Sequence, residues 1–272
     1  MTTVADRPAL PATRRAYRTR AGVELKEFFR QRESVVFTLA FPVLLLLALG
    51  AGLQYDVGDG VSFPQYFMAG VLTAGIVGAG LQNLAIAIAG ERSDGTLKGL
   101  AGTPMPKSAY FAGKVVQVLA VTVVTVVLLL LVGVLVFSVQ LPSGEQWFTF
   151  VWVSLLGAAA CTLLGIAVSS LARSSRSASA TVTPIALALE FISGVFVPFD
   201  RFPGWLQAIA SVFPVRWMAQ GLRSVFLPES LAVREPSGSW GLGLVAIVLV
   251  AWCVLGLLLC VATFRWQDRD AG

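Results

Sequence analysis

Residues 91–104 read ERSDGTLKGLAGTP and form a polar insert of fourteen residues between two long apolar runs. The flanking runs, 66–89 and 109–137, are each long enough to cross a bilayer, since a spanning helix needs about 20 apolar residues. The insert carries two apolar residues of its own, Leu97 and Leu100, which are three apart and therefore share one helix face. This pattern predicts a short helix that contacts something outside the lipid.

The composition of the whole chain indicates a polytopic membrane protein. The chain has 272 residues, of which 56% are hydrophobic and 13% charged, whereas ordinary soluble domains carry about 25% charged residues. Its apolar runs are continuous rather than alternating, which predicts helices and not the strands of a barrel. We expect an all-α fold with six spans, at 35–53, 66–89, 109–137, 148–171, 181–197 and 242–264.

The distribution of lysine and arginine predicts the orientation of these spans. Eight lie in the N-terminal tail, four at or just after the insert, two after the fourth run and two at the C-terminus. The remaining four arginines all lie between the fifth and sixth runs. Since cytoplasmic loops carry the excess of positive charge, both termini and the insert are expected in the cytoplasm.

The chain is expected to divide into a cytoplasmic tail with an interfacial helix at 1–34 and a six-span domain at 35–272. Tyr17, Ala21, Leu25 and Phe28 recur at helical spacing among charged residues, as in a helix that lies in the membrane interface. A disordered basic tail fits the first thirteen or so residues better. The six-span domain contains the cytoplasmic insert, extended to 91–106, and an extracellular segment at 199–239.

The segment 199–239 is too long for a simple turn and contains Trp205 and Trp217. Two stretches in it suit short re-entrant helices in the outer leaflet, where tryptophan and arginine are favoured. Ordinary anchoring by an aromatic belt explains the tryptophans equally well.

Glu190 lies inside the fifth apolar run, where a carboxylate costs about 2.5 kcal/mol or more. Two interpretations stay open. The side chain either makes a polar contact in a substrate path or gate, or lies near the outer interface and pairs with Arg201 or Arg216.

Other single residues predict packing rather than chemistry. Gly70, Gly75, Gly78 and Gly80 in the second run favour close approach of helices. Lys114, just inside the third run, is expected to extend its ammonium to the cytoplasmic surface.

Several classes of function find no support in the sequence. There is no histidine, and the three cysteines all lie in apolar runs without metal-ligand spacing, so no metal site and no catalytic residues are expected. The net charge of +5 follows the membrane topology and does not indicate nucleic-acid binding. The chain also lacks the glycine-rich loop that cradles phosphates, so any ATP must be bound by a partner.

Two sets of motifs resemble a known family. The residues at 91–92, 95–97, 100, 103–104 and 113–114 resemble the signature of type 2 ABC exporter permeases, which include the daunorubicin-resistance-like and the polysaccharide or lipid exporter permeases. The residues at 191–198, 202–206, 213–214 and 221–223 resemble the fifth-span exit and re-entrant helices of that family. Together with the six runs, the resemblance covers nearly the whole chain.

The resemblance implies that the insert is a coupling helix seated in a groove of a separate ATPase. Leu97 and Leu100 would then supply a buried anchor within a polar rim. The residues implied in coupling are Glu91, Arg92, Asp94, Gly95, Thr96, Leu97, Lys98, Leu100, Thr103 and Pro104. Lys98, where an acidic residue is more common, and Met105–Pro106 depart from the family pattern and bear on which ATPase is the partner.

We therefore expect the transmembrane subunit of an ATP-driven exporter in a bacterial cell membrane. It would act with a second permease subunit, in a homodimer or heterodimer, and with two ATPase copies that bind ATP and Mg²⁺. This chain would be no enzyme and would bind no cofactor. Few fixed charges in the spans favour a hydrophobic or amphipathic substrate such as a drug, a lipid or a lipid-linked glycan. The residues expected in the path or gate are Glu190, Phe191, Ser193, Phe196, Trp205 and Trp217.

Three other functions compete with this prediction. An ion- or proton-coupled transporter usually has several ionisable groups near the midplane, whereas this chain has one clear candidate. A membrane scaffold is compatible with the sequence. The sequence offers no pair of nucleophile and base that an intramembrane enzyme would need.

Overall fold

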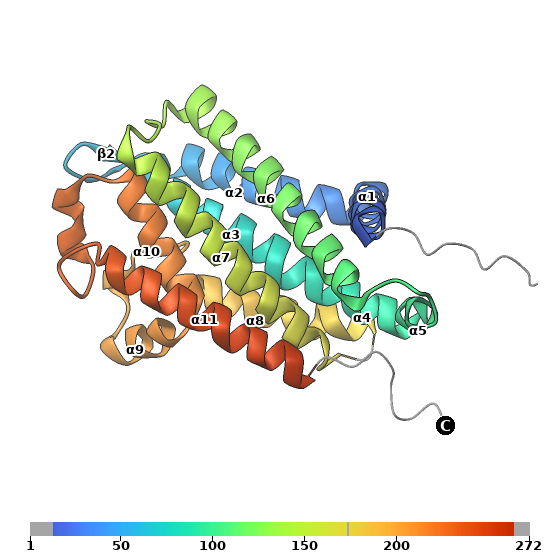
Figure 1. Cartoon of the computed structure of the whole chain (residues 1–272). Helices are drawn as coiled ribbons and strands as arrows, with labels where there is room; N and C mark the ends of the chain where they lie inside the picture. The colour runs from blue at the N-terminus through green and yellow to red at the C-terminus, as the bar shows by residue number, and fades with distance from the viewer. Residues whose placement is uncertain (1–12, 173, 264–272) are drawn as a thin grey trace, which may run out of the picture.

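The computed structural model describes residues 13–172 and 174–263 and shows a bundle of long helices (Figure 1). Within these residues, five helices are long and apolar enough to cross a membrane. They are α2 (Arg32–Gly52), the continuous helical run Phe63–Ser93, α6 (Lys107–Phe137), α7 (Glu145–Ser169) and α11 (Leu242–Thr263). The chain is thus an all-α polytopic membrane protein, as predicted.

The run predicted as a fifth span is helix α8 (Ser175–Ile192), which does not meet the same criterion of length and apolarity. Its first half is rich in serine and threonine, and its start is fixed by a capping box between Ser174 and Ser177. The helix also ends five residues before the predicted limit of 197, because Gly194 adopts a positive φ of 76° that a helix cannot continue.

The run Phe63–Ser93 lies at the centre of the bundle and is not a uniform α-helix. α3 (Phe63–Val77) passes into a π-helical turn, η1 (Gly78–Asn83), before α4 (Leu84–Ser93) begins. Nearly every residue of α3 is buried. Such π-helical turns are rare and frequently mark functional positions.

The glycines of this central run pack closely, with one exception. A Cβ atom at Gly70 would collide with the carbonyl oxygen of Val195, and one at Gly80 would lie 2.9 Å from the Cβ of Cys161. Gly75 is similarly crowded by Thr125. The packing prediction is confirmed at these three positions, whereas Gly78 faces open space.

The two ends of the bundle differ (Figure 1). At one end, called here the α5 end, lie α1 (Thr13–Arg30) and the short helix α5 (Thr96–Ala101). Helix α1 is viewed end-on in Figure 1 while the long helices run across the picture, so it lies across the bundle. The opposite end is called the α9 end. It holds the strands β1 (Asp56–Gly58) and β2 (Val61–Ser62), η2 (Phe199–Arg201), α9 (Gly204–Val212), α10 (Pro214–Phe226) and η3 (Glu229–Arg234).

The segment 199–239 has helices at both places where short helices were predicted, namely α9 and α10. Helix α10 is far more buried than a surface helix, because it packs between α3, α7 and α11. The antiparallel pair β1–β2 was not predicted. It turns through Gly58 and Gly60, both with positive φ, and the Asp56 carboxylate accepts a hydrogen bond from the Gly58 amide at 2.7 Å.

We predict that Gly70→Ala lowers the free energy of unfolding by about 1–3 kcal/mol, because the added methyl group displaces the backbone at Val195. Equilibrium unfolding of the purified chain in micelles with a rising fraction of sodium dodecyl sulfate measures this. Gly243→Ala in α11 is the matched control, since its Cβ meets no atom within 4 Å. Equal stability of the two variants would contradict the packing described.

Candidate functional site

The insert between α4 and α6 folds into a helix, as its sequence predicts. Helix α4 ends at Ser93, and Gly95 turns the chain with a φ of 82°. The Asp94 carboxylate then caps the new helix by accepting a hydrogen bond from the Thr96 amide at 2.9 Å. After α5 ends at Ala101, Pro104 and Pro106 keep the chain extended until α6 begins at Lys107.

Leu97 and Leu100 share one face of α5, but that face is turned toward this chain itself. Leu97 is 1% exposed and packs in an apolar cluster with Phe28, Ile88 and Tyr110. Leu100 is half-buried against the same cluster. The prediction that this pair anchors a partner is therefore wrong for Leu97. Its apolar surface is used to hold α5 on the bundle.

Glu91 and Arg92 were expected in a polar rim around the anchor, and the structure assigns them other contacts. Glu91 is buried, where it accepts a hydrogen bond from the Tyr110 hydroxyl at 2.7 Å. The Arg92 guanidinium donates to the carbonyl oxygen of Ser169 at 2.7 Å, which ties the end of α4 to the end of α7. Both residues thus attach the segment to the bundle through contacts within this chain.

The side chain of Lys114 joins three elements at the α5 end. Its ammonium forms ion pairs with Glu24 of α1, at 2.7 Å, and with Glu91 of α4. Arg20 pairs with Glu24 from the preceding turn of α1. Lys114 is 1% exposed, so the expectation that it reaches the surface is wrong. Two buried carboxylates give its charge a partner inside the bundle.

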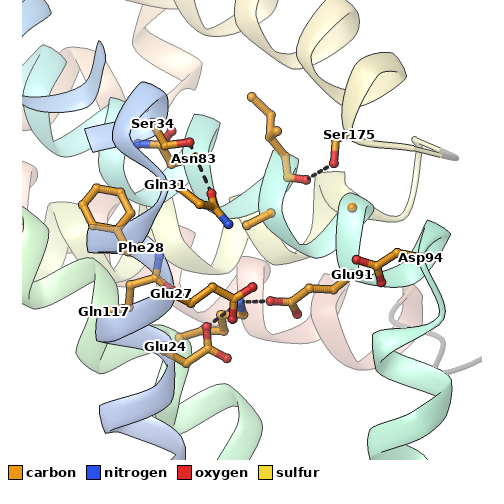
Figure 2. Close-up of a pocket in the computed structure, with 14 residues that line it drawn as sticks. Glu24, Glu27, Phe28, Gln31, Ser34, Asn83, Glu91, Asp94, Gln117 and Ser175 are labelled. Atoms are coloured by element: carbon orange, nitrogen blue, oxygen red, sulfur yellow. Dashed lines mark hydrogen bonds and ion pairs between the residues drawn. The ribbon is translucent and has the colours of Figure 1, made fainter. Parts of the chain in front are cut away.

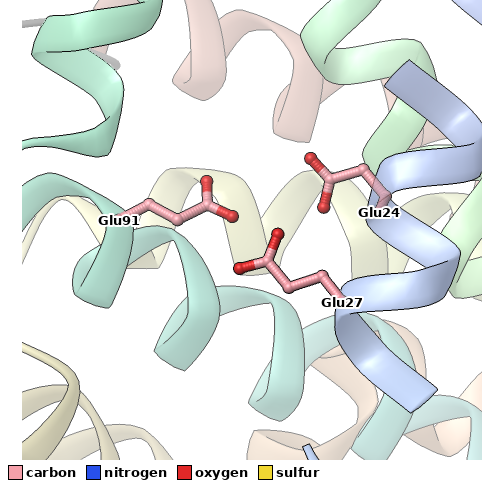
Figure 3. Close-up of side chains that lie close together, drawn as sticks. All are labelled: Glu24, Glu27 and Glu91. Carbon is pink, nitrogen blue, oxygen red and sulfur yellow. The ribbon is translucent and has the colours of Figure 1, made fainter. Parts of the chain in front are cut away.

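Glu24 and Glu91 do not stand alone at this place. Figure 3 shows the carboxylates of Glu24, Glu27 and Glu91 facing one another from α1 and α4, and their oxygens lie within 4.8 Å. Burial raises the pKa of the Glu24 carboxyl, although the nearby ammonium of Lys114 opposes this effect. Figure 2 shows the same carboxylates at the edge of a cavity of about 270 Å³.

The exposed face of the segment consists mainly of polar residues and of residues with small side chains. Exposed residues there are Asp94, Gly95, Thr96, Lys98, Gly99, Ala101, Gly102, Thr103 and Pro104. Although Leu97 is buried, the exposed surface of this segment still carries six of the ten predicted coupling residues. Lys98, which departs from the family pattern, is exposed on it.

Glu190 is 2% exposed and lines a second, apolar cavity of about 140 Å³ between α2, the π-helical turn and α8. The interpretation that it pairs with Arg216 is wrong. The Arg216 guanidinium forms an ion pair with the Glu235 carboxylate, with 3.4 Å between nitrogen and oxygen. No ion pair between Glu190 and Arg201 occurs among the described residues either. The carboxylate thus faces the cavity.

The other residues predicted in a path or gate do not line the cavity at Glu190. The Phe191 and Phe196 rings contact each other, with centroids 4.8 Å apart, and Ser193 is fully buried beside them. Trp217 donates its indole N–H to the Ser211 carbonyl at 2.7 Å. Trp205 is 65% exposed on α9. None of these residues lines either cavity.

A buried ionic cluster at the α9 end was missed by the sequence analysis. Arg223 of α10 pairs with Glu235 at 2.7 Å and donates to the carbonyl oxygen of Gly194 at 3.2 Å. Arg216 joins the same carboxylate, and its guanidinium stacks over the Phe199 ring at 4.3 Å. Helical spacing within 214–226 could have shown that both arginines share one face, but it does not show which carboxylate they meet.

Comparison with known proteins agrees with this architecture. The profile of the family described as ABC-2 type transporter matches residues 17–227, which is more than half of the chain. The chain belongs to the ABC-2 type transporter family. The matched part includes α5, the Lys114 cluster and both cavities.

Individual relatives of this family are distant in sequence. The "Putative transport permease YvfS" of Bacillus subtilis (strain 168) is 22% identical over 245 residues, which cover 90% of this chain and 95% of the relative. "Inner membrane transport permease YadH" of Escherichia coli (strain K12) is 24% identical over 241 residues, covering 85% and 91%. The "Probable multidrug ABC transporter permease YbhR" of the same strain is 26% identical over 149 residues, covering 53% and 39%. This ABC-2 protein is accordingly a multi-pass transmembrane subunit of an ABC transporter.

We predict that Lys114→Met lowers the free energy of unfolding by about 3–5 kcal/mol, because Glu24 and Glu91 lose the cation between them. Unfolding in mixed micelles measures the loss. Adding Glu91→Gln to this variant should restore part of the stability by removing a stranded charge, since Glu24 keeps Arg20 as its partner. Lys98→Met, at an exposed lysine, serves as the control and should stay near the wild-type value. A Lys114→Met chain as stable as this control would refute the role given to the cluster.

Proposed function

We propose that this protein is the permease subunit of an ATP-driven exporter and that α5 is the helix through which a separate ATPase acts on it. One observation carries the proposal: a short helix with a polar outer face is packed on the bundle by a buried leucine, beside buried ion pairs that join α1, α4 and α6. A force applied to such a helix reaches α1, α4 and α6 together. A freely hinged loop would absorb it.

The partner's part in the reaction follows from what this chain lacks. No phosphate-binding loop of the Gly-x-x-x-x-Gly-Lys-Ser/Thr type occurs in the sequence. ATP and Mg²⁺ therefore belong to two copies of a separate ATPase, whose closure would change the conformation of two permease subunits. The excess of lysine and arginine near α1 and α5 supports a cytoplasmic location for that end and for both termini.

The proposed substrate is hydrophobic or amphipathic. Long apolar side chains such as Leu135, Ile247 and Val261 are exposed along α6 and α11, as expected of surfaces that face lipid. The α9 end carries α9 and α10, which we infer to be the re-entrant helices on the exit side. The relative YbhR is named a multidrug ABC transporter permease, which is compatible with an amphipathic drug as substrate.

The docking surface inferred here differs from the one expected from sequence. Because Leu97 is buried, the partner would contact Lys98 and the small exposed residues from Gly99 to Pro104. Lys98 then places a positive charge on the surface, so the facing groove of the ATPase should carry an acidic residue. The coupling role stays with α5, and only the face that performs it changes.

We predict that the double variant Lys98→Glu and Ala101→Arg abolishes stable association with the ATPase and lowers the yield of the complex at least about tenfold. Both residues are exposed, so the fold itself should be unchanged. Co-purification from the native membrane, followed by a test of ATP hydrolysis by the isolated complex, measures the association. Arg201→Glu is the control, since it reverses an exposed charge at the opposite end.

Retention of the ATPase by the double variant would overturn the docking surface. Transport that follows a proton gradient and ignores ATP would overturn the proposed function and favour a proton-coupled carrier, with Glu190 as its ionisable group.

A further inference from the structure

The two cavities meet at one residue. The first, shown in Figure 2, lies beside α1 at the α5 end, and the second lies deeper along α2 at Glu190. Asn83 lines both, at the last position of the π-helical turn. It is also the single asparagine of the whole sequence. The cavities therefore follow each other along the same side of the central helical run.

The second cavity has an unpartnered carboxylate in an apolar wall. No hydrogen bond or ion pair to the Glu190 side chain occurs among the described residues, and it is almost fully buried. The Phe37 and Phe41 rings stack at 5.2 Å on the α2 side. A buried carboxylate beside aromatic rings is a favourable environment for an organic cation, which would supply the missing charge partner.

The first cavity carries an excess of negative charge. Glu24, Glu27, Glu91 and Asp94 line it, whereas Lys114 is its one cationic residue among the lining residues that the structure describes. Lys114 and Arg20 both pair with Glu24, and Lys114 pairs with Glu91, so Glu27 and Asp94 are left without a cation.

Gln117 adds an independent indication of a ligand in this cavity. It lines the cavity, is 8% exposed, and its Oε1 atom accepts no hydrogen bond. A buried amide oxygen without a donor is unusual in a folded protein. An ammonium group is a donor that would satisfy it.

Two side-chain hydrogen bonds join residues that line the two cavities. The Asn83 amide donates to the Thr38 hydroxyl, and that hydroxyl donates to the Ser34 carbonyl at 2.6 Å. Ser34 lines the first cavity and Thr38 the second. Gly78, at the other end of the π-helical turn, lines the second cavity and leaves its space open. Rotation of the Asn83 side chain would open a connection without moving a helix.

The volumes of the two cavities suit one functional group of a ligand at a time. A cavity of about 150 Å³ in another protein admits benzene, so the 140 Å³ beside Glu190 has room for an ammonium with a short stem. Phe28, Ile86 and Ala87 give the first cavity an apolar wall that a bare metal ion would not use. The combination of carboxylates and apolar walls matches an amphiphile with one cationic nitrogen.

We propose that the two cavities are successive binding stations for the cationic nitrogen of an amphipathic substrate, which enters beside α1 and passes Asn83 to reach Glu190. This inference rests on the proposed transport function and names its substrate class. The hydrocarbon part of the substrate would remain along the apolar surface of α2 and α8 while the nitrogen occupies each cavity in turn.

A matched pair of fluorescent probes tests the proposal on the full chain in lipid nanodiscs. Dansylcadaverine carries a primary ammonium, and N-pentyl dansylamide has the same skeleton without it. Dansyl fluorescence is titrated against nanodiscs with and without the protein. Wild type should bind the ammonium probe at least about tenfold more tightly than the neutral probe.

Three variants assign the binding to residues. Glu190→Gln should lower the preference for the ammonium probe severalfold, leaving what the first cavity provides, and Glu27→Gln, at an exposed position that does not endanger the fold, should also weaken it severalfold. Asn83→Ala should speed the slower phase of binding in a stopped-flow experiment. Glu145→Gln, an exposed carboxylate at the α9 end, is the control and should bind like wild type.

Equal affinity of wild type for the two probes would overturn the proposal, as would a preference that Glu190→Gln leaves unchanged. Displacement of the ammonium probe by millimolar Mg²⁺ through a shared site would assign the first cavity to a metal ion instead. If these results occur while the ATPase still co-purifies, the substrate class is wrong and the transport function stands. Loss of ATPase association from the wild-type chain would instead remove the proposed function.

Discussion

The structure at the α5 end depends on one buried ammonium, that of Lys114. Removing an ammonium and two carboxylates from water costs several kcal/mol per ion, so the cluster is stable only while all three charges stay together. Because Glu24, Glu91 and Lys114 belong to three elements far apart in sequence, this requirement fixes α1 and the end of α4 to α6. Leu97 of α5 then packs into an apolar cluster to which the same three elements contribute together with α7 and α11. Charge and apolar burial thus hold one rigid assembly beneath the exposed face of α5.

The α9 end also contains a buried ion cluster. Glu235 forms ion pairs with two arginines of α10, which helps this helix to lie buried between α3 and α7. Between the two ionic clusters the bundle is apolar, and Glu190 is the exception that neither cluster neutralises. Glycines bring the central run so close to its neighbours that little space remains except at the π-helical turn. The fold thereby leaves its open, acidic space on one side of the bundle, in line from α1 to Glu190.

Much of this arrangement can be predicted from the sequence, and the predictions that differ from the structure do so for identifiable physical reasons. Apolar length predicted the long helices, and the spacing of the two leucines in the polar insert predicted the short helix α5. The serine-rich start of α8 made the fifth run less apolar than a span, a feature that run length alone does not weigh. Spacing placed Leu97 and Leu100 on one face, yet only tertiary packing decides whether that face meets a partner or the chain itself. Lys114 was misjudged because an isolated lysine favours the surface, and its two carboxylates lie 90 and 23 positions away.

The most direct test of the account measures whether α5 is rigidly attached to α1 through Lys114. Spin labels are placed at the exposed positions Lys26→Cys and Lys98→Cys, in a chain whose three native cysteines are replaced by alanine, and their separation is measured by double electron–electron resonance in nanodiscs. We expect one narrow distance distribution, which becomes broad when Lys114→Met is added. A distribution already broad with Lys114 in place, or one that Lys114→Met leaves narrow, would contradict the claim that this buried ion cluster holds the coupling helix.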